Sequence, residues 1–161
     1  MTLVGMDLAL IYNPQLQVFD LALSGTDLAT DDTLASAVLV SLICDRLAEP
    51  YEVQPGEDRR GWWADVYASN DHKTGSRLWL LAREKQLPGV MQRCKQYCEE
   101  ALQWFIDDGL ATAITVTVFV PRMGWLVALI QFSINGQSRN YRFEFDQTRQ
   151  VWRLAGESNA V

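Results

Sequence analysis

The feature that most constrains the fold is a stretch of alternating side chains between residues 112 and 146. Apolar residues recur at every second position in its first part, at Ile114, Val116, Val118 and Val120, and this period is typical of a strand with one buried face. A second apolar run, Trp125 to Ile134, ends at Asn135-Gly136, a strong hairpin signal because both central positions of a type I′ turn need positive φ. A third run, Arg139 to Asp146, follows. The pattern predicts an antiparallel meander, to which Val151 to Leu154 adds a short edge strand.

Helices are expected before the meander. Asp31-Asp32-Thr33 offers N-cap oxygens and negative charge for a helix that runs to about Ala48, and its middle is apolar on nearly every side, as in a buried helix. A short helix is expected over Arg77 to Gln86, with Ser76 as its N-cap. A longer one is expected from Val90 to Asp108, because apolar residues recur there at three- and four-residue spacing until Gly109.

These elements predict an α+β fold with helices packed on an antiparallel β-meander. A short N-terminal β-hairpin is added by two apolar-rich runs on either side of Asn13-Pro14-Gln15. We expect a single domain over residues 1–161. Residues 1–30 form the hairpin and lead-in, residues 31–109 the helical part with a long loop at 49–74, and residues 110–155 the strands.

Composition limits the partners of the chain. Its 161 residues carry a net charge of -6, which disfavours free nucleic acid as a partner. The longest apolar stretch, Ala37 to Cys44, is too short to span a bilayer, and residues 1–12 lack the Lys and Arg of a signal peptide. We therefore expect no membrane partner, and we expect the three cysteines to be reduced thiols in a cytosol.

Sequence motifs for catalysis are absent: there is no P-loop, no G-x-G-x-x-G and no H-E-x-x-H. His72, the only histidine, lies in a polar turn, where a solvated side chain is the simplest interpretation. Cys94 and Cys98 lie four residues apart on the apolar side of the long helix, and core packing explains them better than a metal site without further ligands. We expect no metal and no cofactor.

The most informative local feature is a loop segment with the composition of a protein interface. It combines Glu57, Asp58, Arg59, Arg60, Trp62 and Trp63. Arginine pairs bidentately with carboxylates, and tryptophan gives a large rigid contact area. The alternative is that the arginines hold the loop to its own domain while the tryptophans fill the core. Asp107 and Asp108 oppose the helix dipole in a last helical turn, which indicates either an exposed turn or an acidic patch for a basic partner.

Three strings together resemble a known family. They are residues 20–32, DLALSGTDLATDD; residues 58–65, DRRGWWAD; and residues 75–81, GSRLWLL. In this order they resemble the baseplate wedge proteins of Mu-like contractile-tailed phages. More distantly the chain resembles the gpW and lysozyme-like wedge family, which includes the baseplate subunit of type VI secretion systems. In that wider family an acidic-proline-arginine loop contributes to wedge contacts, whereas here Pro55 precedes the acids.

The resemblance implies a structural subunit of a tail baseplate, present in several copies and bound to other wedge, hub or sheath proteins. It also implies a place in the virion tail after synthesis and assembly in the bacterial cytoplasm. Two alternatives remain open. A peptidoglycan-degrading tail lysozyme would need Glu57 or Asp58 with Asp65 as its carboxylates. A small prophage-encoded binding protein would need an apolar pocket.

Overall fold

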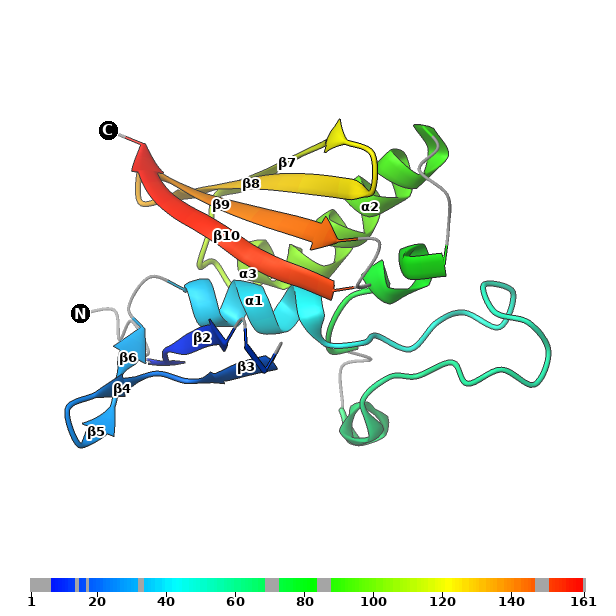
Figure 1. Cartoon of the computed structure of the whole chain (residues 1–161), viewed down its shortest axis with the longest axis horizontal. Helices are drawn as coiled ribbons and strands as arrows, with labels where there is room; N and C mark the ends of the chain where they lie inside the picture. The colour runs from blue at the N-terminus through cyan, green and yellow to red at the C-terminus, as the bar shows by residue number, and fades with distance from the viewer. Residues whose placement is uncertain are drawn as a thin grey trace. The chain divides into compact units, whose positions relative to one another are not determined.

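The C-terminal strands form one antiparallel sheet, in the order β10-β9-β8-β7 (Figure 1). The computed structural model describes residues 7–13, 15–16, 18–31, 34–68, 73–83, 88–146 and 151–160. The strands are β7 (Ala113–Arg122), β8 (Trp125–Ile134), β9 (Gln137–Asp146) and β10 (Val151–Ala160). Asn135 and Gly136 both have positive φ, so the predicted meander and its hairpin are confirmed. The edge strand is longer than predicted and has an irregularity between Leu154 and Gly156.

One face of this sheet carries the core. Val116, Ile130 and Tyr141 lie opposite one another on three neighbouring strands and are all buried. Helix α2 (Pro88–Leu102) packs against β7 and β8, and α3 (Trp104–Asp107) follows it. Phe105 of α3 meets Phe132 edge to face with ring centroids 5.2 Å apart. The α+β class predicted from the sequence is therefore confirmed.

The helices are shorter than the sequence pattern predicted. Helix α1 (Ala35–Ile43) buries Val38, Leu39 and Leu42 but ends five residues before Ala48. The expected long helix is interrupted at Gln103, whose N–H bonds the carbonyl of Glu100, three residues back. The segment Leu78–Arg83, labelled η2, is a 3₁₀ helix rather than an α-helix. The expected caps Asp32 and Thr33 lie outside the described residues.

The chain divides into two compact units, Met1–Val40 and Ser41–Val161. In its described part the first contains three two-stranded ribbons: β1 (Asp7–Leu8) with β6 (Thr30–Asp31), β2 (Leu10–Asn13) with β3 (Val18–Leu21), and β4 (Leu23–Ser24) with β5 (Asp27–Leu28). Backbone hydrogen bonds among Ala9, Ala22 and Ala29 join the ribbons. The β2–β3 pair confirms the predicted N-terminal hairpin.

No helix in the described ranges is long and apolar enough to cross a membrane. The same ranges contain no group of three or more His, Cys, Asp or Glu side chains that could hold a metal. Cys94 and Cys98 are fully buried on α2, as expected for core residues. His72 lies outside the described residues.

Burial should control the reactivity of the thiols. Hydrogen bonding to Cys98, together with burial, raises the pKa of Cys94 well above its ordinary value, and the thiolate is the reactive form. Only Cys44 is exposed. We expect a disulfide reagent to titrate one thiol in the folded protein and three in urea. A folded Cys44→Ser variant that still reacts rapidly would contradict this placement of α2.

Candidate protein-docking site

A long loop leaves and re-enters the second unit at one point. Asp45 and Ser76 form a parallel β-bridge, in which Ser76 N–H bonds the Cys44 carbonyl at 2.8 Å and Arg46 N–H bonds the Ser76 carbonyl at 2.9 Å. The Ser76 hydroxyl also donates to the Leu42 carbonyl at 2.6 Å. Gly75 has φ +88, and a Cβ there would lie 2.3 Å from the Cys44 oxygen. The closure therefore depends on a residue without a side chain.

Both arginines of the predicted interface contact their own loop and its surroundings. The Arg59 Nε donates to the Ala48 carbonyl at 2.7 Å, and Ala48 N–H returns a bond of 2.9 Å to the Arg59 carbonyl. Arg60 pairs with Asp45 at 2.7 Å and lies over the Trp79 ring, 4.4 Å from its centroid. Arg60 has φ +56, an uncommon conformation for a residue with a side chain. These contacts hold the returning strand of the loop in one place.

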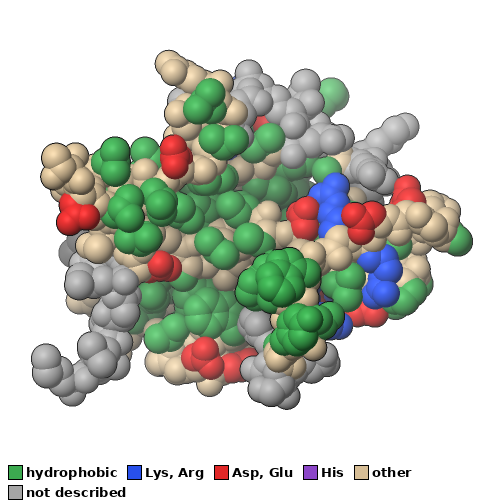
Figure 2. Space-filling model, turned by 90° about the horizontal axis from the view of Figure 1, so that it is seen from below, with side chains coloured by type: hydrophobic (Ala, Val, Ile, Leu, Met, Phe, Trp, Pro, Cys, Tyr) green, Lys and Arg blue, Asp and Glu red, His purple; other side chains and the backbone are tan. Residues whose placement is uncertain are grey.

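The tryptophans next to these arginines do not fill the core. Trp62 is 52% exposed and Trp63 is 73% exposed. Trp63 begins η1, a single 3₁₀ segment (Trp63–Tyr67), in which Val66 and Tyr67 are each 80% exposed. The rings of Trp63 and Tyr67 meet edge to face at 6.3 Å. The structure thus gathers four large apolar side chains, which we call the aromatic surface: Trp62, Trp63, Val66 and Tyr67. The face of the molecule in Figure 2 carries bulky hydrophobic side chains that project from it.

The 3₁₀ segment that carries this surface is anchored by its one carboxylate. Asp65 accepts hydrogen bonds from Thr74 N–H at 2.9 Å and from the Thr74 hydroxyl at 2.8 Å. Two acids of the predicted site, Glu57 and Asp58, are exposed and accept hydrogen bonds from the backbone N–H groups of Gln54 and Arg60. These two carboxylates therefore serve local turns, whereas Asp65 joins η1 to Thr74, nine positions along the chain.

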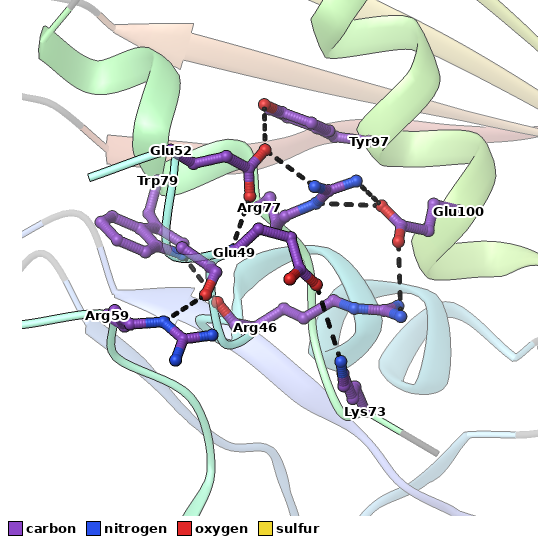
Figure 3. A network of polar contacts seen from close by, with 10 residues as sticks. Arg46, Glu49, Glu52, Arg59, Lys73, Arg77, Trp79, Tyr97 and Glu100 are labelled. Atoms are coloured by element: carbon purple, nitrogen blue, oxygen red, sulfur yellow. Dashed lines mark hydrogen bonds and ion pairs between the residues drawn. The ribbon is translucent and has the colours of Figure 1, made fainter. Parts of the chain in front are cut away.

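A network of charged side chains connects the loop to α2 (Figure 3). The Arg77 guanidinium lies between two carboxylates, 2.7 Å from Glu52 and 2.6 Å from Glu100. Tyr97 donates to the same Glu52 oxygen at 3.2 Å, and its ring lies under Arg77 at 4.7 Å. Arg46 reaches the second oxygen of Glu100 at 3.3 Å. The side chains of Arg77 and Glu52 are each only 12% exposed, so this is an internal framework.

The ionisation of the network fits a structural role. Burial alone would raise the pKa of Glu52, but the Glu49 N–H, the Arg77 guanidinium and the Tyr97 hydroxyl together hold that pKa below its ordinary value. Burial, assisted by the charge of Glu52, raises the pKa of Tyr97 to about 12. Glu52 is consequently charged and Tyr97 neutral at pH 7, which are the states that the hydrogen bond between them requires.

The two acids at the end of α3 are exposed, in accordance with a turn. Asp107 accepts a hydrogen bond from the Gln103 side chain at 3.0 Å, and Asp108 caps α3 at its C-terminus. Asp107 lines an open hollow of about 490 Å³. Arg46 and Lys73 line the same hollow, so its charge is mixed rather than purely acidic.

The sequence did not predict the charge network or two residues of the aromatic surface. The network residues Glu52, Arg77, Tyr97 and Glu100 were not expected, because they are separated by up to 48 positions between Glu52 and Glu100 and no local pattern joins them. For Val66 and Tyr67, in contrast, the sequence contains a local pattern that could have predicted their place in the site. Trp63 and Tyr67 are four residues apart in a short run bounded by Gly61, a spacing that places side chains on one side of a helical turn.

The fold and the candidate site define a small α+β protein with an exposed aromatic surface. Comparison with known proteins gives its family. The sequence model of the family described as Phage protein GP46 matches residues 34–139. The baseplate protein gp46 of Escherichia phage Mu is 41% identical over 128 residues, which cover 78% of this chain and 87% of the relative. The Mu-like prophage FluMu protein gp46 of Haemophilus influenzae is 41% identical over 108 residues, covering 67% and 73%.

The chain therefore belongs to the phage protein GP46 family. The predicted resemblance to baseplate proteins of Mu-like phages is confirmed.

Proposed function

We propose that this chain is a structural wedge subunit of a phage or prophage tail baseplate and that it acts through protein contacts. The name of its relative from phage Mu, a baseplate protein, supports the baseplate role. In this proposal its partners are other wedge, hub or sheath proteins. Several copies enter each virion tail, and assembly takes place in the cytoplasm of the host bacterium.

The observation that carries the proposal is the aromatic surface on its anchored loop. Monomeric proteins rarely expose a large contiguous apolar patch, so such a patch usually marks an interaction site. Tryptophan and tyrosine are also the residues most enriched at the energetic centres of interfaces. Asp65, Arg59 and Arg60 already hold the loop through internal contacts. The loop that carries the four side chains is thus held before a partner binds, which lowers the entropy cost of binding.

Trp63→Ser should separate docking from folding. Because this side chain is 73% exposed, its loss should leave the melting temperature nearly unchanged. Its loss from the centre of an interface should cost about 2 kcal/mol or more in association. We expect fewer assembled tails in electron micrographs of lysates in which the variant is the sole source of the protein.

Met123→Ser is a matched control. Met123 is 94% exposed and lies in the turn between β7 and β8. The substitution therefore also removes an exposed apolar side chain, but one that is not part of the aromatic surface. Normal tail numbers with both variants would contradict the proposed docking role. A marked loss of thermal stability in Trp63→Ser would instead assign the ring to the fold.

The charged residues of the predicted interface have a supporting role in the proposal. Glu57, Asp58, Arg59 and Arg60 shape the loop and form the rim of the surface that carries Trp62 and Trp63. Asp107 and Asp108 form a separate exposed acidic contact for a basic partner. Their exposure supports this assignment.

We further propose that the subunit is not an enzyme. A glycosidase needs a carboxylic acid kept protonated by an apolar pocket and a second carboxylate opposite it. Glu57 is exposed in a turn, and Asp58 accepts the Arg60 N–H. Asp65 is engaged by both donors of Thr74. None of the three has the apolar surroundings of a general acid.

A further inference from the structure

The two edges of the main sheet differ in how well they are protected. At β10 the edge strand carries Arg153 and an irregularity between Leu154 and Gly156. Charges and bulges of this kind prevent a further strand from adding to a sheet. At β7 the chain carries no charged residue between Gly109 and Pro121, and its pairing with β8 is regular from Ala113 to Phe119. β7 has such features only at its C-terminal end, where Arg122 follows Pro121 and the pairing with β8 is irregular between Phe119 and Arg122. From Ala113 to Phe119 the edge has neither a charge nor an irregularity.

The sequence of β7 is also nearly the same in both directions. If two copies pair antiparallel about Thr117, Val116 faces Val118, Thr115 faces Phe119 and Ile114 faces Val120. Each of these pairs joins β-branched or aromatic residues, which have the highest strand propensity and give favourable cross-strand pairs. The next pair would set Ala113 against Pro121, which has no N–H to donate, so the pairing ends at Ile114 and Val120. No like charges meet anywhere in the pairing.

The side chains are disposed as such a pairing requires. Thr115 and Thr117 are exposed on one face of the sheet, and Val116 is buried on the other. Pairing in this register would extend the same polar face and the same apolar face into the second copy. A shift by one residue would place threonines against the apolar core, so the pattern excludes registers displaced by an odd number of residues.

We propose that β7 is a self-association edge, at which a second copy of this chain adds its own β7 antiparallel to form one continuous sheet. A two-fold axis at Thr117 closes the interface, so association stops at two copies. The β10 edges then lie at the two ends of the joined sheet. This inference does not depend on the aromatic surface or on the proposed baseplate role.

Sedimentation equilibrium of the full chain tests the proposal, with Thr117→Lys as the diagnostic variant. Lysine is tolerated on an exposed strand face, but here it would place two ammonium groups opposite each other across the axis. We expect the wild type to show a monomer–dimer equilibrium that Thr117→Lys weakens at least tenfold. Gln131→Lys adds the same charge to an exposed position of β8, away from the edge, and should dimerise normally.

Amide hydrogen exchange gives an independent reading. Exchange in β7 should slow as concentration rises in the wild type but not in Thr117→Lys, whose fold is checked by its melting curve. A wild type that stays monomeric at millimolar concentration would overturn the proposal. A dimer that survives Thr117→Lys, or one that Trp63→Ser abolishes, would also overturn it, and the latter would place self-association at the aromatic surface.

Discussion

Replacing Arg77 with methionine is expected to lower the free energy of unfolding by about 3 to 5 kcal/mol at neutral pH, because removing one partner of a buried ion pair leaves the other charge uncompensated. Arg77 is the only guanidinium that bonds both Glu52 and Glu100 among the described residues. Without it the Glu52 carboxylate, whose side chain is 12% exposed, keeps its bonds from Glu49 N–H and Tyr97 among the described residues. Urea denaturation at pH 7 measures the loss.

Two further variants isolate the cause. Arg77→Met combined with Glu52→Gln removes both charges and should recover part of the stability. Lys95→Met removes an exposed partner of Glu99, with the side chains 51% and 47% exposed, and should cost no more than about 0.5 kcal/mol. Equal unfolding midpoints for Arg77→Met and Lys95→Met would show that the network does not stabilise the loop.

The pH dependence should change in a defined direction. A carboxyl whose pKa is lowered by folding stabilises the protein above its unfolded pKa, and that contribution is lost as pH falls through the folded pKa. Glu52 is such a group in the wild type. Removing Arg77 takes away two of the influences that lower this pKa, so acid destabilisation of Arg77→Met should begin at a higher pH than in the wild type.

Sheet and hairpin could be predicted because their signals are local. Alternation along β7 and the Asn135-Gly136 turn determine the faces and the register without reference to distant residues. Helix ends were less predictable because they depend on tertiary contacts. Helix α1 ends at Ile43, because the chain then becomes extended and Asp45 pairs with Ser76. Ser76 lies 31 positions after Asp45, and no local sequence pattern predicts this pairing.

In the loop, too, the sequence gives only part of the structure: its composition can be interpreted, but the orientation of its side chains cannot. Its sequence indicated an interface-like set of arginines and tryptophans, yet it did not show which side chains point inward. Arg59 and Arg60 find acceptors on the outgoing strand of the loop, at Ala48 and Asp45, and long cationic side chains can do this while their charge stays hydrated. Trp62 and Trp63, in contrast, remain exposed at the surface.

Gly75→Ala is the second change with a large expected effect: it should lower the free energy of unfolding by about 3 kcal/mol or more, because a steric clash adds to the cost of a left-handed conformation. An added Cβ would lie 2.3 Å from the Cys44 oxygen and 2.7 Å from its carbonyl carbon. Both are backbone atoms, so no rotation of a side chain relieves the clash. The chain must move apart where Ser76 bonds Cys44 and Leu42, and Arg77 follows directly after it. One methyl group should therefore weaken both the loop closure and the charge network.

Gly56→Ala is the control that separates this clash from backbone strain. Gly56 has the same φ of +88, but an added Cβ would meet nothing within 4 Å. Its cost should be only that of a side chain in the left-handed region, about 1 to 2 kcal/mol. Urea unfolding of the two variants gives the difference. If they lose the same stability, the close approach of Gly75 to Cys44 does not constrain the fold.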